Sequence, residues 1–515
     1  MLSSRRRPPS PSTPETLSTV DYASIATRAQ AARSAGQQIV LVLGLGFVGT
    51  AVAGNLARAE QGGKPLFFVI GLDRDDAAGR EKAGALDLGR SPTYANDPSL
   101  ERVIRECCLT TKNLVGGVDP RLIALADVVV SCINLDVQRA PGQTEKLTVP
   151  TEGYAAAMRM VGAHMRPGTL VTVESTLPIG TCDRVLYPAL CEGQAKQGVD
   201  VKAQPPKLAY CYERVMPGPD YLDSVNNFWR AYAGVDAASA DAARDFLALY
   251  VNTGQFPLWR HKSTRAAEMA KLLENSYRAT NIAFIEEWSK LAEGVGVDLF
   301  DVIKSVRVRK GTHDNMMLPG LGVGGYCLTK DALLAAYGAE KLIGIPAEMP
   351  FSRRAILTNE RMPLRAVEWI ERHFAGQLAG RKAALIGVTY RPGVNDTRST
   401  PSEIVARALL ERGASVDAYD PLVTHWDELP HVRVSQDPSA VLRGAQIVVI
   451  CLPDPLYRPF LADALKAELT AGAIVVDPWN MIVDACAADF ARRGIALEVY
   501  GRGDYAKAAP AAVKG

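Results

Sequence analysis

The segment IVLVLGLGFVGTAVAGNLARAE (residues 39–60) decides the fold of this chain. Residues 39–43 form a short apolar run, as a buried strand does, and residues 50–60 have the apolar spacing of a helix. The glycine-rich sequence GLGFVG (44–49) lies between them. The order strand, tight turn, helix predicts the first unit of a parallel α/β sheet.

Similar apolar runs recur on both sides of a long helical pattern. The runs LFFVIGLD (66–73), DVVVSCIN (127–134) and TLVTVEST (169–176) alternate with helix-like stretches, and four more such runs occupy residues 381–393, 415–421, 446–454 and 473–480. From about residue 263, good helix formers continue for some 30 residues between a Ser/Thr start and a Gly stop. We therefore predict an α/β protein with two Rossmann-like, doubly wound domains joined by a long central helix.

The expected domain boundaries lie where the sequence changes between strand-like and helix-like patterns. Residues 1–36, which begin MLSSRRRPPSPSTPETLST, lack the apolar core of a secretory signal and are predicted to be a disordered leader. The first sheet domain is expected over 37–235, a central helical domain with a glycine-rich loop over 236–345, and the second sheet domain over 346–515.

Composition narrows the class of ligand. The chain has 515 residues, a formal net charge of +2 and no apolar run long enough to span a bilayer, so we expect neither nucleic-acid nor membrane binding. Its nine cysteines form no CxxC pair and no metal-ligand spacing, which favours a reducing, cytoplasmic setting and no metal site. A small anionic ligand is the expected partner.

The GLGFVG turn predicts a dinucleotide site. Gly44 permits the turn, Gly46 lets the backbone approach a pyrophosphate, and Gly49 lets helix and strand pack closely, so that the amides of Phe47 and Val48 face phosphate. Asp73 ends the second strand, where a carboxylate accepts hydrogen bonds from an adenosine ribose. That acid favours NAD over NADP, although Arg74 beside it leaves NADP open.

A second candidate site surrounds one cysteine. Cys327 lies in GVGGYCLTKD (322–331), where glycines let backbone amides approach a substrate and where Lys330 and Asp331 follow closely. A thiolate is the strong nucleophile and is stabilised by nearby positive charge. Lys271 and Asn275 lie four residues apart on the predicted long helix, so they project from one face. A buried cysteine and a solvated helix face are the alternatives.

Together these motifs resemble one family, the nucleotide-sugar 6-dehydrogenases, which includes UDP-glucose and UDP-N-acetylhexosamine dehydrogenases. The resemblance covers nearly the whole chain. GLGFVG, ESTLPIGT (174–181), the segment YCYER-x-x-PG (210–218), K-x-x-x-N (271–275), GVGGYCLTKD and RPGVNDTRSTPS (391–402) occur in the order used by that family.

The resemblance implies roles for individual residues. Cys327 resembles the family nucleophile, Lys271 the ammonium that stabilises an oxyanion, Asn275 its hydrogen-bonding companion and Asp331 the carboxylate beside the thiol. The remaining assignments are Glu213 for water handling in hydrolysis, Thr176 for holding a water or the cofactor, Lys330 and Arg398 for the cofactor, and Arg214, Gly324, Gly325, Tyr326 and Arg391 for the substrate. Arg309 is expected to reach a phosphate of the substrate, with a solvated basic run as the alternative.

The implied activity is NAD-dependent, four-electron oxidation of the C6 alcohol of a UDP-sugar through a Cys327 thioester, for polysaccharide precursor synthesis. In relatives the long helix forms a dimer core, so Ile282, Phe284, Ile285, Trp288 and Leu291 are expected in a homodimer, unless they only pack the domains together.

Departures from the family pattern leave open which sugar the substrate carries. Arg391 replaces a common Lys, residues 134–137 lack the usual Thr-Pro, and Tyr210-Cys211-Tyr212 replaces the commoner Ser-Pro before Glu213. UDP-N-acetylhexosamine is slightly favoured on the PGxGVGG loop, with UDP-glucose as the alternative. Two other readings stay open: a two-electron hydroxyacid dehydrogenase and a non-catalytic nucleotide-binding regulator.

Overall fold

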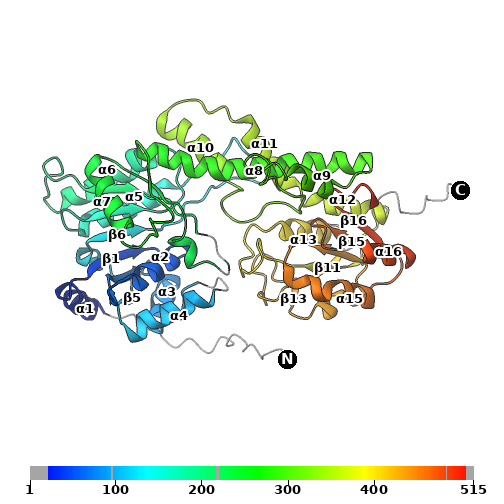
Figure 1. Cartoon of the computed structure of the whole chain (residues 1–515), viewed down its shortest axis with the longest axis horizontal. Coiled ribbons are helices and arrows are strands. Elements are labelled where there is room, and N and C mark those ends of the chain that lie inside the picture. Colours follow the sequence, from blue (N-terminus) through cyan, green and yellow to red (C-terminus); the bar gives the residue numbers. More distant parts are fainter. Residues whose placement is uncertain (1–20, 94–96, 216–217, 219, 483, 506–515) are drawn as a thin grey trace. The chain divides into compact units, whose positions relative to one another are not determined.

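The computed structural model describes residues 21–93, 97–215, 218, 220–482 and 484–505 (Figure 1). The chain divides into two compact units. Unit 1 comprises residues 1–135, 151–176 and 180–268, and unit 2 comprises residues 136–150, 177–179 and 269–515. The two short segments of unit 2 therefore interrupt the chain of unit 1.

Unit 1 contains a sheet whose described strands run in the order β10-β9-β8-β7-β6-β1-β4-β5. Its strands are β1 (Gln38–Leu43), β4 (Phe67–Leu72), β5 (Leu114–Gly117), β6 (Val128–Ser131), β7 (Leu170–Val173), β8 (Lys207–Tyr210), β9 (Ala231–Gly234) and β10 (Trp259–Arg260), with a separate hairpin of β2 (Glu60–Gln61) and β3 (Lys64–Pro65). Its helices include α2 (Phe47–Arg58), α3 (Ala77–Asp87), α4 (Pro98–Arg105), α5 (Thr151–His164), α6 (Tyr187–Lys196) and α7 (Ala237–Leu247).

The predicted apolar runs of this unit become its central strands. Residues 39–43 are buried throughout, and β1 pairs in parallel with β4 on one side and β6 on the other. A strand covered on both faces needs apolar side chains at every position, which is why the run does not alternate. The carboxyl ends of β1, β4 and β6 consequently lie at one edge of the sheet.

The leader prediction is wrong for residues 22–34, which form helix α1 (Tyr22–Ser34). Asp21 caps this helix by accepting a hydrogen bond from the Ser24 amide, and Ile25, Ala29 and Ala32 are buried. Residues at these intervals share one face of a helix, and this face packs against the rest of unit 1. The other leader residues up to 20 lie outside the described part of the chain.

The predicted central domain, 236–345, is divided between the units. Residues 236–268 join unit 1, because β9 pairs antiparallel with β8 and β10 adds beyond it, with α7 packed against β9. Helix α8 (Thr264–Val295) confirms the predicted long helix, and the division at residue 268 falls within it.

Unit 2 contains a second parallel sheet with the order β13-β12-β11-β14-β15-β16 in its described part. The strands are β11 (Lys382–Ile386), β12 (Ser415–Tyr419), β13 (Arg433–Ser435), β14 (Ile447–Ile450), β15 (Ile474–Asp477) and β16 (Ala496–Val499). The helices are most of α8 with α9 (Leu299–Val306), α10 (Asp331–Tyr337), α11 (Pro350–Arg361), α12 (Leu364–His373), α13 (Pro401–Glu411), α14 (Pro438–Leu442), α15 (Arg458–Glu468) and α16 (Asp484–Arg492).

Helices cover both faces of this second sheet. Leu385 and Val449 belong to one buried cluster with residues of α12 and α13, whereas Ile386 and Ile450 belong to another with residues of α14, α15 and α16. Adjacent residues of one strand point to opposite faces, so both clusters are built from the same strands. The doubly wound α/β architecture predicted from the sequence is confirmed.

Candidate active site

The GLGFVG turn has the geometry of a phosphate cradle. Gly44 has φ +97°, and a Cβ on Gly49 would lie 1.8 Å from the Gly44 carbonyl oxygen, so both positions require glycine. Gly46 caps α2 without a side-chain hydrogen bond, and a Cβ placed on it would meet nothing within 4 Å. No side chain of Gly46 therefore stands before the first turn of α2, which begins with Phe47 and Val48, and a helix N-terminus favours an anion.

Asp73 ties the end of β4 to this turn. Its Oδ2 accepts a hydrogen bond from the Leu45 amide at 2.8 Å, and its Oδ1 accepts one from the Arg74 amide at 2.8 Å. A carboxylate has about four lone-pair sites, so it can still accept hydrogen bonds from ribose hydroxyls. The Arg74 side chain is 80% exposed and pairs with Asp76 at 3.2 Å. The residues present fit a dinucleotide.

The loop before α10 holds Cys327 in a compact turn. The Thr329 hydroxyl donates to the Gly325 carbonyl at 2.8 Å, and the Asp331 amide donates to the Cys327 carbonyl at 3.0 Å. Gly325 has φ +79°, and a Cβ on Gly324 would lie 2.8 Å from both Pro401 and Tyr390 side-chain atoms. Glycine is therefore required where the loop packs against the start of the second sheet domain.

Exposure separates Cys327 from the other cysteines. All nine lie in the described residues; Cys327 is exposed, Cys191 is half-buried and the rest are buried. Burial raises the pKa of Cys107 to about 11 and that of Cys108 to about 12, because the thiolate loses its hydration. The alternative of a buried filler therefore does not apply to Cys327.

Lys271, Asn275, Lys330 and Asp331 form one electrostatic cluster. The Asn275 amide donates to Asp331 Oδ2 at 2.6 Å, and Lys330 Nζ lies 3.6 Å from Asp331 Oδ1. Burial raises the pKa of Asp331, while the positive charges of Lys330 and Lys271 and the Asn275 hydrogen bond act in the opposite direction. The face of α8 that carries Lys271 and Asn275 is therefore directed at the carboxylate four residues after the thiol.

Other predicted substrate residues surround this loop in unit 2. The Arg398 guanidinium lies 4.6 Å from the centre of the Tyr326 ring and forms paired hydrogen bonds with Asp396 at 2.8 Å. Arg391 is half-buried and its carbonyl accepts from Thr389, whereas Arg309 is exposed beyond α9. Lys330 and Arg398, expected to contact the cofactor, belong to unit 2 and not to the unit that holds GLGFVG.

The remaining predicted residues belong to unit 1. Glu213 is 6% exposed and accepts a hydrogen bond from the Val215 amide, and Thr176 is half-buried just beyond β7. Arg214 donates to the Trp229 carbonyl and stacks over Phe228 at 5.5 Å. Residues 216 and 217 of the YCYER-x-x-PG segment lie outside the described residues.

Two buried carboxylates were missed from the sequence. Glu174 pairs with Arg230 at 2.8 Å, with both side chains almost fully buried, and Glu213 repels its charge. Glu268 accepts hydrogen bonds from the amides of Gly180 at 2.6 Å and Cys182 at 2.8 Å. Each of the two carboxylates binds a partner that is far away in sequence, which sequence spacing cannot predict. The motif ESTLPIGT contains Glu174 and Gly180, but neither residue was singled out in it.

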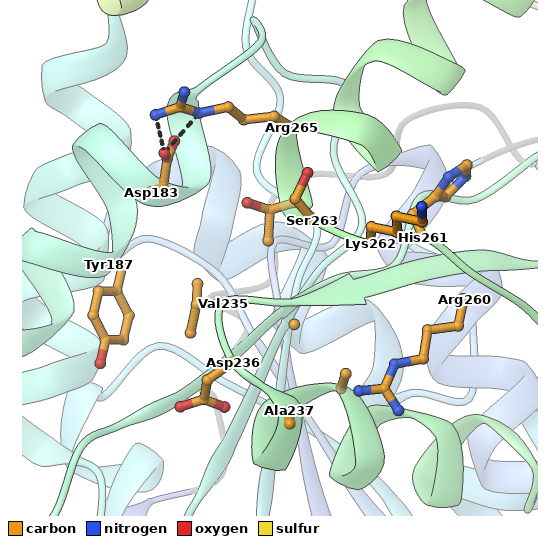
Figure 2. A pocket seen from close by; sticks show the side chains of 13 residues that line it. Asp183, Tyr187, Val235, Asp236, Ala237, Arg260, His261, Lys262, Ser263 and Arg265 are labelled. Atoms are coloured by element: carbon orange, nitrogen blue, oxygen red, sulfur yellow. Dashed lines mark hydrogen bonds and ion pairs between the residues drawn. The ribbon is translucent and has the colours of Figure 1, made fainter.

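A cavity of about 840 Å³ lies in unit 1. Figure 2 shows the side chains that line it, including Tyr187, Asp236 and Arg260, and the ion pair between Asp183 and Arg265. None of the predicted catalytic or binding residues lines it. In the described residues, no helix is long and apolar enough to cross a membrane.

Comparison with known proteins identifies the family. The NAD binding, central and UDP binding domains of the UDP-glucose/GDP-mannose dehydrogenase family match residues 38–246, 265–361 and 384–484, which together make up more than half of the chain. The chain is 29% identical over 448 residues to a UDP-N-acetyl-D-mannosamine dehydrogenase of Methanocaldococcus jannaschii, covering 86% of this chain and 92% of that protein.

Two solved structures agree with this assignment. An NDP-N-acetyl-D-galactosaminuronic acid dehydrogenase from Methanosarcina mazei Go1 is 26% identical, with a TM-score of 0.74 and coverage of 93% of this chain and 98% of that one. A UDP-glucose dehydrogenase from Pyrobaculum islandicum is 26% identical, with a TM-score of 0.73 and coverage of 90% and 98%. The chain therefore belongs to the UDP-glucose/GDP-mannose dehydrogenase family and is an NAD-dependent oxidoreductase.

Proposed function

We propose that this enzyme oxidises the C6 primary alcohol of a UDP-sugar to a carboxylate through a thioester on Cys327. The observation that carries the proposal is an exposed thiol on a glycine-rich turn whose next residues reach the cluster of Lys271, Asn275 and Asp331. A two-electron dehydrogenase needs no such thiol, and a non-catalytic regulator has no use for the full set of charged groups around it.

The chemistry explains why a thiol is needed. Oxidation of an alcohol to an acid removes two hydrides, and NAD, when bound, supplies the hydride acceptor for each. After the first loss, the Cys327 sulfur adds to the aldehyde carbon and gives a thiohemiacetal, which keeps the aldehyde on the enzyme. Loss of the second hydride leaves a thioester, and water then releases the carboxylate and restores the thiol.

Charged side chains assist these steps in the proposal. The Lys271 ammonium stabilises the developing alkoxide and oxyanion, with Asn275 as a further donor; removing one such donor costs about 10²–10³ in rate. Glu213 or Asp331 moves the proton of the hydrolytic water, and Thr176 holds that water or the cofactor. Burial raises the pKa of Asp331, which favours its protonated form more than in an exposed carboxyl group.

Ligand binding is divided between the two sheet domains in this proposal. The GLGFVG turn and Asp73 hold NAD, with Lys330 and Arg398 as further contacts. Residues 384–484 match a UDP binding domain, so the nucleotide of the substrate is assigned there. The substrate contacts proposed are Arg214, Arg309, Gly324, Gly325, Tyr326 and Arg391.

The favoured sugar is an N-acetylhexosamine. The PGxGVGG loop favours it, and the relative from Methanocaldococcus jannaschii is named for UDP-N-acetyl-D-mannosamine. UDP-glucose is the alternative, since the relative from Pyrobaculum islandicum is named for that sugar. The product is a nucleotide-linked uronic acid, which suits polysaccharide precursor synthesis in the cytoplasm.

The test is a panel of UDP-sugars with NAD, in which NADH is followed by absorbance and counted per sugar consumed. The proposal predicts two NADH for each sugar, with an N-acetylhexosamine giving the highest kcat/KM. One NADH per sugar would support the two-electron alternative, and binding without NADH formation would support the regulator.

A homodimer through α8 is also proposed. Leu273, Tyr277, Phe284, Trp288, Leu291 and Val295 are each 47–65% exposed, and at 100° per residue they fall within an arc of about 60°. Of the residues predicted for the dimer, Phe284, Trp288 and Leu291 lie on this stripe, whereas Ile285 is buried and Ile282 half-buried. A continuous exposed apolar stripe of this kind marks an interaction surface.

A further inference from the structure

The segment of residues 136–150 belongs to unit 2, although the strand before it, β6, and the helix after it, α5, belong to unit 1. It is closed on itself by an antiparallel bridge, in which the backbones of Gln138 and Thr148 exchange hydrogen bonds of 2.8 and 2.9 Å. The chain thus leaves the sheet of unit 1, forms a closed loop within unit 2 and returns.

Two arginines join this loop to α11, the half-buried Arg139 of the loop and the buried Arg353 of α11. Arg139 pairs with Oε1 of Glu360, a residue of α11. Oε2 of Glu360 accepts a hydrogen bond from the Gly142 amide at 3.2 Å. Arg353, also on α11, pairs with Glu145 of the loop at 2.8 Å and donates to the Thr144 carbonyl. The Arg139–Glu360 pair is largely shielded from solvent, with side chains 12% and 23% exposed, whereas Glu145 in the second pair is 69% exposed.

Arg139 also contacts the turn that carries Cys327. Its Nη2 donates to the Thr329 carbonyl at 3.4 Å, while the Thr329 hydroxyl donates to the Gly325 carbonyl. Arg139 therefore binds the backbone of Thr329, which lies two residues after Cys327. The hydroxyl of the same Thr329 closes the turn by its hydrogen bond to Gly325. Nη2 reaches both Glu360 and the Thr329 carbonyl, while Nη1 donates to the Gln143 carbonyl at 3.1 Å.

We infer that Arg139 is a positioning residue, which fixes the Cys327 turn by joining the Thr329 carbonyl to Glu360. The role rests on the proposed function, because a fixed turn matters for catalysis only if Cys327 is the nucleophile. Among the described residues, the hydrogen bonds of Arg139 go to Gln143, Thr329 and Glu360 and not to Lys271 or Asp331. Its effect therefore passes through the backbone of the turn.

The test compares Arg139→Ala and Arg139→Lys with the wild type in the full-length enzyme. The measurements are kcat, KM for NAD, melting temperature, and the rate at which iodoacetamide alkylates Cys327, mapped by mass spectrometry. Arg28→Ala is the matched control, because Arg28 also donates to a backbone carbonyl, that of Lys112 at 3.0 Å, but lies on α1.

Arg139→Ala is expected to lower kcat about 10-fold or more, since small misplacements of reacting groups have costs of this size, and to leave KM for NAD unchanged. The alkylation rate of Cys327 should change severalfold, and Arg28→Ala should change neither quantity. Arg139→Lys should recover the melting temperature through its pair with Glu360, but not kcat, because a single ammonium cannot reproduce the geometry in which Nη2 donates to Glu360 and Thr329 while Nη1 donates to the Gln143 carbonyl.

Wild-type kcat and alkylation rate in Arg139→Ala would overturn the inference, as would full recovery of kcat in Arg139→Lys. Failure of the proposed function has a different signature. A wild type that releases no NADH with any UDP-sugar would reject the oxidation, while the alkylation rates would still decide whether Arg139 fixes the Cys327 turn.

Discussion

Cys327 and Asp73 owe their assigned roles to their surroundings. A buried thiol with a pKa of about 11, such as Cys107, is ionised in about one molecule in ten thousand at pH 7, so desolvation keeps it unreactive. Cys327 is exposed to solvent and does not share that burial. Asp73 is instead fixed by two backbone amides, one of them from the glycine-rich turn itself.

Asp73→Asn is expected to raise the KM for NAD about 10-fold or more, because a charged hydrogen bond contributes about 1.5–3 kcal/mol. The neutral amide keeps the shape of the side chain but loses the charge that attracts ribose hydroxyls. Steady-state kinetics at varied NAD would measure the change. Asp75→Asn is the control, since Asp75 is exposed and pairs with Arg80; an equal rise in both variants would refute the role of Asp73.

The sequence was informative where one residue and its neighbours define the chemistry. Cys327, Asp331 and the glycines around them could be selected because they stand in one short loop, and Lys271 with Asn275 because helical spacing places them on one face. The pair of Glu174 and Arg230 could not be found in this way, because its members are 56 residues apart and meet only through the pairing of β8 with β7 and β9.

Among the elements, helix α8 carries both a buried structural carboxylate and a residue of the candidate active site. Its first turns carry Glu268, bound to the Gly180 and Cys182 amides, and one turn later Lys271. Burial raises the pKa of Glu268 to about 7 from an ordinary value of 4.5, although the two amides oppose the shift. Below about pH 7 the neutral form therefore predominates in the folded protein.

This shift predicts a pH dependence of stability. Because the folded pKa is the higher one, the stabilisation from Glu268 is complete below pH 4.5 and is lost as the pH rises towards and through 7. Glu268→Gln stays neutral, so its melting temperature should fall less between pH 5 and pH 8 than that of the wild type. Scanning calorimetry would measure this, with the exposed Glu287→Gln as control; identical falls in wild type and Glu268→Gln would contradict the prediction.

Long apolar or helical patterns were enough to predict most central elements. The runs at 39–43 and 66–73 became β1 and β4, and the pattern from residue 263 became α8. The sequence did not reveal β9 and β10, because strands of four and two residues at a sheet edge carry little periodicity. Helix α1 was missed because its buried face consists of Ile25 and two alanines.

For the whole molecule, the proposed assembly depends on the exposed stripe of α8. Replacing Trp288 and Leu291 together by Glu places charges at its centre, and a charge in a buried interface is costly unless it is paired. The double variant should therefore behave as a single chain in light scattering coupled to size exclusion, while the wild type has twice that mass. Glu287→Ala on the same helix is the control; an unchanged mass of the double variant would reject this dimer.

The central claim is that the Cys327 sulfur carries the sugar during oxidation, and it is tested most directly by analysing the products of Cys327→Ser by mass spectrometry. The variant is incubated with UDP-N-acetylhexosamine and NAD beside the wild type and Cys191→Ser, the half-buried cysteine as control. The account predicts free uronic acid from wild type and Cys191→Ser, and none from Cys327→Ser. Formation of uronic acid by Cys327→Ser at the wild-type rate would contradict it.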